Sequence, residues 1–352
     1  MTFPIDIGRK VGRPARGVLR LLAMPLLVVA FSSAAQVQEA WVNRYNGGLT
    51  NLDHRPVALA LDASGNVYVA GSSQTTSSNY DYVVLKYASD GTQAWAARYA
   101  PPTGGTNTVA ALALDQGGNA CVTGTAGTVK IGAGGALAWA APYAGTSLAT
   151  DTNGNVYVTG FSTSEFATVK LDAGGSNVWL GTFNSHPGYP AASQRVGVDQ
   201  AGNLYVAGWA MMARWVPPVY YTSPWLVRYD PAGAQAWAHQ CLADYDGLEI
   251  SIRGLLFDSS GNVYVTGNGA DPAETAKVSP SGQELWFSDY GWWPGVSAMV
   301  LDGMGNVYLT SSTYVTVKID SGTGSVAWGS DLWFVDQGYI ASSGIALDLD
   351  PA

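Results

Sequence analysis

The stretch LDASGNVYVAG, residues 61–71, is the first of six related copies along the chain. Each copy begins with an aspartate, which a Gly-Asn pair follows at a fixed spacing. Glycine supplies the positive φ angle of a tight turn, and an aspartate carboxylate accepts hydrogen bonds from the N–H groups of that turn. Each copy therefore predicts a β-hairpin. The six aspartates are Asp62, Asp115, Asp151, Asp199, Asp258 and Asp302.

A second block follows each hairpin, with a basic residue after an apolar stretch, a glycine turn, and a tryptophan four residues after the glycine. The basic residues are Lys86, Lys130, Lys170, Arg228, Lys277 and Lys318. The tryptophans are Trp95, Trp139, Trp179, Trp237, Trp286 and Trp328. Each unit thus predicts four strands, which we name A to D and expect in the first copy at residues 57–62, 66–71, 82–87 and 93–99.

The repeat length predicts the architecture. Trp41 has the same neighbourhood as Trp95, and the six intervals from Trp41 to Trp328 average about 48 residues. A period of about 40–50 residues is typical of four-stranded propeller blades. We therefore predict an all-β protein, a β-propeller with six complete blades and a partial seventh. That seventh blade would contain the terminal strands, at residues 41–45 and 345–350.

The end of the chain follows the repeat only in part. Asp350 occupies the position of the repeated aspartate, and the sequence stops before the expected Gly-Asn pair. We interpret residues 36–352 as one propeller domain that is truncated at its C-terminus. The alternative is six blades with two additional strands.

Three segments, GNVYVTG, KYASDGTQAWAARY and ALALDASGNVYVAG, resemble the bacterial SBBP repeat family, which is named for a seven-bladed β-propeller. The resemblance covers about residues 36–352. It implies the propeller fold, and it implies no reaction because the family is defined by its repeat. Function must therefore be argued from individual residues.

Residues 1–35 have the pattern of a secretory signal peptide. Five basic residues precede the apolar run of residues 21–31, and small residues follow at 33–35. Eleven apolar residues are fewer than the ~20 that span a bilayer. We expect cleavage after Ala35 and no membrane span in the mature chain. The predicted location is secreted, meaning extracellular, at the cell surface or periplasmic.

Composition limits the partners. The net charge is −9, and removing residues 1–35 makes it more negative, so nucleic acid is a poor partner. Cys121 and Cys241 are too few for a disulfide framework, and we expect Cys121 to be buried. We expect a monomer without a cofactor.

Loops predict where a partner binds. The tight A–B and C–D hairpins should share one face, and the longer, more variable B–C and D–A loops the other, where binding is more common. The fourth unit has a long B–C insertion, and another aromatic loop follows the fifth unit. The candidate contacts are Trp209, Arg214, Trp215, Tyr220, Tyr221, Trp292 and Trp293. An alternative is that the insertion folds back over its own blade.

The predicted function is a secreted, non-catalytic β-propeller that binds a protein or glycan through this face. Asp244, Asp246 and Glu249 are weak calcium candidates, and a solvated acidic loop is the simpler interpretation. No histidine lies in a catalytic motif, so no catalytic residue is assigned. The alternative function is a secreted hydrolase or lyase. A quinoprotein is a weaker alternative, because only the repeat at residues 320–328 is similar to a quinoprotein tryptophan-docking motif.

Overall fold

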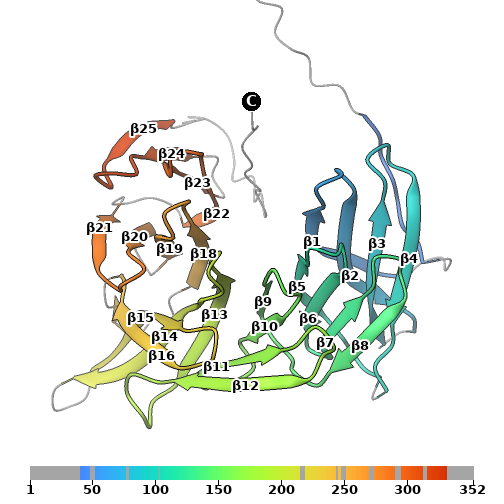
Figure 1. Ribbon diagram of the computed structural model, residues 1–352, viewed down its shortest axis with the longest axis horizontal. Helices are drawn as coiled ribbons and strands as arrows, with labels where there is room; N and C mark the ends of the chain where they lie inside the picture. The colour runs from blue at the N-terminus through green and yellow to red at the C-terminus, as the bar shows by residue number, and fades with distance from the viewer. Residues whose placement is uncertain are drawn as a thin grey trace, which may run out of the picture. The chain divides into compact units, whose positions relative to one another are not determined.

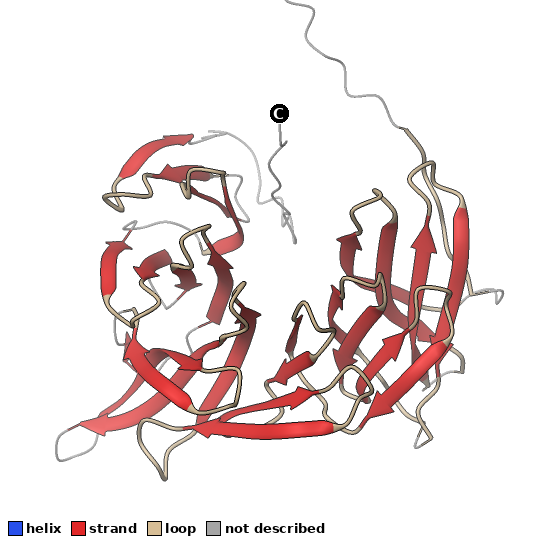
Figure 2. Ribbon diagram, in the orientation of Figure 1, coloured by secondary structure: helices blue, strands red, loops and turns tan. Residues whose placement is uncertain are grey.

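The computed structural model describes residues 40–47, 52–76, 79–102, 104–214, 219–242, 245–246, 251–268, 273–289, 295–311 and 315–330. The chain divides into two compact units, residues 1–40 and 41–352, and every described strand belongs to the second. The described residues contain strands, turns and loops and no helix (Figure 2).

Six four-stranded antiparallel units follow one another along the described chain (Figure 1). The first three comprise β1 (His54–Leu61), β2 (Val67–Gln74), β3 (Tyr80–Tyr87), β4 (Gln93–Tyr99); β5 (Val109–Leu114), β6 (Ala120–Gly124), β7 (Gly127–Ile131), β8 (Leu137–Ala141); β9 (Ser147–Thr150), β10 (Val156–Thr159), β11 (Ser164–Leu171) and β12 (Asn177–Phe183). The last three comprise β13 (Ala191–Val198), β14 (Leu204–Arg214), β15 (Val219–Tyr229), β16 (Gln235–Gln240); β18 (Ser251–Phe257), β19 (Val263–Asn268), β20 (Ala273–Val278), β21 (Glu284–Asp289); β22 (Val296–Leu301), β23 (Val307–Ser311), β24 (Thr316–Ile319) and β25 (Val326–Ser330).

Each unit pairs its strands in chain order, as the predicted strands A to D require. The first strand of each unit packs beside the first strand of the next, in the order β1, β5, β9, β13, β18 and β22. A short parallel pairing of β11 with β13 joins the third and fourth units into one hydrogen-bonded sheet. The prediction of an all-β fold built from four-stranded units is confirmed.

The repeated Asp-Gly-Asn segment forms the A–B hairpin as predicted. In the first unit, Asp62 Oδ1 accepts hydrogen bonds of 3.0 Å from the backbone N–H groups of Ser64 and Asn66. Asn66 Nδ2 donates to the other carboxylate oxygen at 2.8 Å. Gly65 has a φ of 75°, which an L side chain rarely adopts. The same aspartate–asparagine contact recurs in all six units, so the hairpin is an element of the fold.

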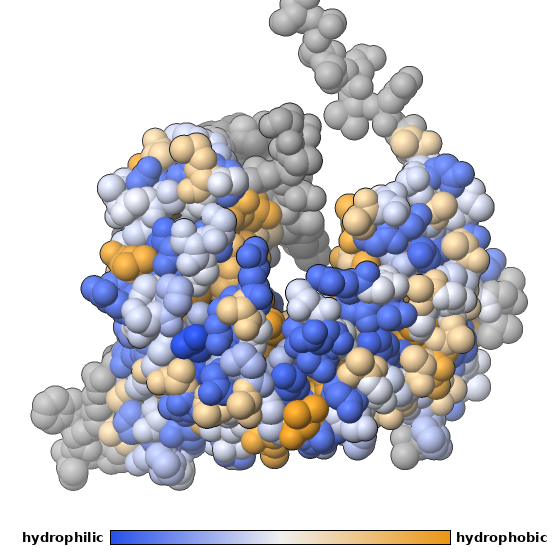
Figure 3. Space-filling view, in the orientation of Figure 1, coloured by the Kyte–Doolittle hydropathy of each residue, from blue (hydrophilic) through white to orange (hydrophobic). Residues whose placement is uncertain are grey.

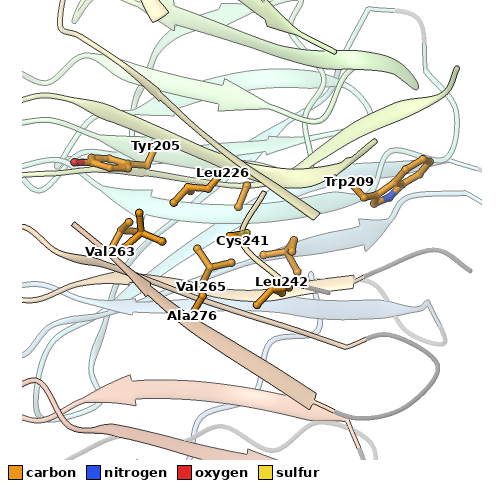
Figure 4. Packing of buried hydrophobic residues seen from close by; sticks show 11 residues of the cluster. Tyr205, Trp209, Leu226, Cys241, Leu242, Val263, Val265 and Ala276 are labelled. Carbon is orange, nitrogen blue, oxygen red and sulfur yellow. The ribbon is translucent and has the colours of Figure 1, made fainter. Parts of the chain in front are cut away.

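The core lies between successive units. Figure 4 shows one such layer, in which Tyr205 and Leu226 of the fourth unit pack against Val263 and Val265 of the fifth. Cys241 belongs to this layer. Both cysteines are buried and unbonded, which confirms the prediction of burial for Cys121 and agrees with the absence of a disulfide framework. Burial raises the pKa of the Cys121 thiol to about 12.

The repeated tryptophans connect neighbouring units. The Trp95 indole of the first unit lies on Gly135 in the C–D turn of the second, and its Nε1–H donates to the Ala133 carbonyl at 2.9 Å. Equivalent indole–glycine contacts occur along the described chain. The pairs are Trp41–Gly91, Trp95–Gly135, Trp139–Gly175, Trp179–Gly233, Trp237–Gly282 and Trp286–Gly324.

The predicted strand at residues 41–45 is wrong in one respect. Trp41 docks on Gly91 as a D-strand tryptophan would, and its Nε1–H donates to the Ser89 carbonyl at 3.2 Å. However, residues 41–45 form no strand, and no described strand pairs with them. The other predicted terminal strand, at residues 345–350, lies outside the described residues.

Candidate functional site

The long hairpin of the fourth unit distinguishes it from the other units. Strands β14 and β15 have 11 residues each, whereas the other described strands have at most eight. Their pairing is continuous from Leu204–Tyr229 to Arg214–Val219. Figure 1 shows this hairpin projecting from its unit.

The predicted B–C insertion is therefore largely strand, which corrects its interpretation as a loop. Residues 209–214 extend β14 and residues 219–221 extend β15 in regular antiparallel pairing. Trp209, Val219, Tyr220 and Tyr221 are of residue types that favour extended backbone. A ladder that has already formed between β14 and β15 continues without interruption into residues of this kind.

Trp209, a predicted contact residue, is buried in the core. Its side chain is only 8% exposed and packs in the layer between the fourth and fifth units. Figure 4 places it at one end of that layer. Met212 is also buried. These two side chains cover the hairpin's own unit, as the alternative interpretation of the insertion expected.

Among the predicted residues whose side chains the structure describes, Tyr220 is the exposed one. It is 47% exposed, and its ring lies 6.3 Å from that of Tyr189, at an interplanar angle of 61°. Tyr221 is half-buried, and its backbone pairs with Asp246. We call Tyr189 and Tyr220 the tyrosine pair. It presents two aromatic rings from separate elements at one place on the surface.

The loop at residues 184–190, between β12 and β13, holds Tyr189 in position. Asn184 Nδ2 donates to the carbonyls of Ser164 and Tyr189, at 2.7 and 2.9 Å. The Asn184 side-chain oxygen accepts the His186 N–H at 2.8 Å. Because these bonds organise the loop before any ligand binds, its partner surface is partly preformed.

The loop's last residue attaches it to the hairpin. Met211 N donates to the Pro190 carbonyl at 2.8 Å. His186 Nδ1 lies 3.0 Å from Ser185 Oγ, which places an imidazole on the same loop as Tyr189. The sequence analysis did not include Tyr189 and His186 among the candidate contact residues. The length of this D–A loop could have indicated them, because longer loops on a rigid scaffold often bind partners.

A two-residue strand, β17 (Tyr245–Asp246), pairs with Tyr221 and Thr222 on β15. It brings part of the D–A loop of the fourth unit to the hairpin. Only the backbone of Asp246 is described, and the other calcium candidates, Asp244 and Glu249, lie outside the described residues. The described residues contain no group of three potential metal ligands. The calcium site remains a prediction.

Four further candidates are not placed. Trp215, Trp292 and Trp293 lie outside the described residues, and only the backbone of Arg214 is described, at the end of β14. The structure therefore brings together Tyr220, Tyr221 and the loop that bears Tyr189. It does not place the remaining aromatic residues.

The repeated aspartates and lysines have structural roles. Lys130 Nζ lies 2.7 Å from Asp115 Oδ2, with both side chains almost fully buried, and 3.2 Å from the Gly154 carbonyl of the next unit. Burial raises the pKa of the Asp115 carboxyl, but hydrogen bonds from Asn119 and Lys130 outweigh burial, so the pKa lies below its ordinary value. The carboxylate is thus held ionised by the hairpin.

On the face shown in Figure 3, polar residues predominate and apolar residues occur in small separate groups. A partner on this face would meet mainly polar side chains. In the part of the chain that the structure describes, no helix is long and apolar enough to cross a membrane.

Successive four-stranded antiparallel units whose first strands pack side by side define a β-propeller. The model of the SBBP β-propeller repeat matches residues 141–167, from the end of β8 into β11. The chain therefore carries an SBBP β-propeller repeat, which confirms the resemblance found in the sequence. No curated protein matches the chain significantly.

Solved propeller structures resemble this fold. BamB from Moraxella catarrhalis is 15% identical, with a TM-score of 0.53, and the match covers 78% of this chain and 76% of that chain. A catalytically inactive virginiamycin B lyase from Staphylococcus aureus, solved with quinupristin, is 12% identical, with a TM-score of 0.54 and coverage of 82% and 87%. The Cps50 (Swd1) β-propeller domain from Myceliophteria thermophila is 11% identical, with a TM-score of 0.53 and coverage of 80% and 88%. At these identities the likeness concerns the fold alone.

Proposed function

We propose that this chain is a secreted, non-catalytic β-propeller that binds an extracellular protein or glycan through the β14–β15 hairpin and the loop at residues 184–190. The observation that carries the proposal is the tyrosine pair, in which Tyr220 is 47% exposed on the extended hairpin and the half-buried Tyr189 of the adjoining loop lies beside it. Tyrosine is enriched at protein interfaces, and its ring offers an apolar face together with a hydroxyl.

The rigidity of the surrounding structure supports this proposal. Trp209 and Met212 attach the hairpin to the core, and the Asn184 hydrogen bonds fix the adjoining loop. A binding surface on a rigid scaffold loses little conformational entropy when a partner binds. The Asp–Lys pairs lie in the hairpins of the repeat and supply no acid–base site there.

A double variant, Tyr189→Ala with Tyr220→Ala, tests the surface. The wild type should capture a partner in a glycan array or in an extracellular pull-down, and the array and the pull-down separate the two partner classes. The double variant should weaken binding of that partner about tenfold or more, because large aromatic contacts dominate interface energetics.

Phe287→Ala is the matched control, since Phe287 on β21 is an exposed aromatic residue at 40% exposure, far along the chain from the hairpin. Its binding should equal that of the wild type. If the tyrosine variant and the wild type bind every identified partner equally well, the tyrosine pair is not the site.

Secretion is part of the proposal and has its own test. The charged, apolar and small-residue segments within residues 1–35 support export and cleavage. Mass spectrometry of the exported protein should give a mature chain that begins at Gln36. An intact N-terminus at Met1 on the exported protein would contradict cleavage.

A further inference from the structure

The first strand of five described units carries a β-bulge at one position. In each case one residue, five before the hairpin aspartate, is left out of the pairing with the second strand. These residues are Val57, Ala110, Gln194, Arg253 and Ser297. Bulges redirect side chains and are common beside functional sites. Long polar side chains occupy the position only in the fourth and fifth units, on β13 and β18.

Arg195 connects these two bulges. Its Nη1 donates to the Gln194 carbonyl at 2.9 Å, and its Nε donates to the Arg253 carbonyl of the neighbouring strand at 3.4 Å. Gln194 Oε1 accepts the Ile252 N–H at 2.7 Å. Strands β13 and β18 lie side by side in Figure 1. The Arg195 guanidinium is therefore held at the junction of two inner strands.

The Arg195 guanidinium lies against the backbone of Arg253, so two cationic residues adjoin at this junction. Burial and the positive charge of Arg253 both lower the pKa of Arg195. Among the described residues, neither guanidinium forms an ion pair with a carboxylate, although the chain has 26 acidic residues against 17 basic ones. By contrast, Lys130 has an aspartate at 2.7 Å. Two neighbouring like charges cost stability unless an anion compensates them.

We propose that Arg195 and Arg253 form a binding site for the carboxylate of a small acidic ligand, such as a uronic acid. The hydrogen bonds to the Arg253 and Gln194 carbonyls engage Nε and Nη1 of Arg195, which leaves its Nη2 group to donate. Arg253 is exposed and makes no side-chain hydrogen bond among the described residues. Guanidinium groups match a carboxylate with paired, charge-assisted hydrogen bonds.

The net charge of the chain favours a small ligand over a polymer of high charge. At −9, the protein repels a polyanion at long range, whereas a single carboxylate interacts mainly with the nearby arginines. This site is separate from the tyrosine pair: Arg195 pairs with Ala207, six residues before Ala213, which pairs with Tyr220. At a rise of ~3.3 Å per residue, these positions are about 20 Å apart along β14. The inference does not depend on the proposed function.

Titration of the full chain with sodium D-glucuronate tests the site, with D-glucose as the neutral match and sodium sulfate as a second anion. Calorimetry should show saturable binding of glucuronate and none of glucose. Arg253→Gln should raise the dissociation constant about tenfold, because it removes one of two charge-assisted partners. Raising NaCl from about 20 to about 200 mM should weaken binding through screening.

Arg55→Gln is the matched control. Arg55 is an exposed arginine on β1 that is already paired with Asp53, so its replacement should leave glucuronate binding unchanged. Equal binding of glucuronate and glucose, or equal binding by Arg253→Gln and wild type, would overturn the site. Binding of sulfate without glucuronate would overturn the assignment to a carboxylate. Because Arg253 is exposed, its variant should fold even where Arg195→Gln does not.

Discussion

At the scale of single residues, the contact between a glycine and a tryptophan couples each unit to the next. A Cβ on Gly135 would lie 2.9 Å from the Trp95 ring, and Gly135 has a φ of 89°. The turn thus requires glycine twice, once for its backbone angle and once for the indole above it. Neighbouring units are coupled by shape and by the indole hydrogen bond together.

Gly135→Ala should lower the free energy of unfolding by about 2 kcal/mol, because it combines an unfavourable φ angle with a clash against the indole. Urea denaturation would measure the change. Gly134→Ala is the control, since a Cβ there has no neighbour within 4 Å, and we expect a change within about 0.5 kcal/mol. Equal stability of the two variants would contradict the docking role of the glycine.

A second residue-scale prediction concerns acid. The pKa of Asp115 is lowered in the folded state from 3.8, so the unfolded chain binds more protons as the pH falls. The contribution of ionised Asp115 to the free energy of unfolding is therefore complete above the pKa that this carboxyl has in the unfolded chain. It is lost as the pH falls through the pKa of Asp115 in the folded chain. Asp115→Asn should cost about 3 kcal/mol near pH 7, since it leaves buried Lys130 without its ion pair.

The difference between Asp115→Asn and wild type should shrink as the pH falls below about 4 and through the lowered folded-state pKa of Asp115, below which the wild-type carboxyl is also neutral. Urea denaturation at a series of pH values measures it. A difference that stays constant down to the acid transition would show that the charge of Asp115 does not contribute to stability.

At the scale of elements, the β14–β15 hairpin combines a buried side and an exposed end. Trp209 and Met212 face the core, whereas Tyr220 lies at the surface beside Tyr189. The ladder between the strands supplies the rigidity, and position along the hairpin separates the two roles, because Tyr220 pairs with Ala213, four residues beyond Trp209 toward the tip.

Trp209→Ala should destabilise the protein by about 3 kcal/mol, because it leaves a cavity in the layer between the fourth and fifth units. Tyr220→Ala should change stability by no more than about 0.5 kcal/mol. Thermal and urea unfolding would measure both variants. A large loss of stability in Tyr220→Ala would mean that this residue supports the fold, which contradicts its assignment to the surface.

At the scale of the whole molecule, the first unit differs from those that follow it. Leu59 and Leu61 on β1 are 64% and 57% exposed, whereas Leu112 and Leu114 at the same positions of the second unit are partly buried. A cavity of about 290 Å³, lined by Leu59, Val69 and Tyr87 among others, lies on this face. The sequence at residues 345–350 has the pattern of another first strand, and we expect it to cover β1.

Leu59→Asp should therefore destabilise the full chain by about 2 kcal/mol and a chain ending at Ser330 by much less, since only the full chain would bury the charge. Urea denaturation of the four proteins measures the coupling. Val178→Asp is the control, at 53% exposure on β12, and should be near neutral in both backgrounds. Equal effects of Leu59→Asp in the two chains would contradict coverage by the C-terminal segment.

The amino-acid sequence by itself determined the repeat, the hairpins and the four strands of each unit. These features depend on local chemistry: turn glycines, aspartates that accept neighbouring N–H groups, and apolar strands between them. The period of about 48 residues was sufficient to predict propeller blades.

Only the tertiary structure decided which side chains the units bury and which they bring together. Trp209 and Tyr220 belong to one aromatic segment, yet packing against the fifth unit buries the first and leaves the second exposed. Arg195 and Arg253 are 58 residues apart in sequence and meet because β13 and β18 pack side by side. Contacts of this kind depend on how separate units stack, and local residue patterns do not predict which side chains that stacking brings together.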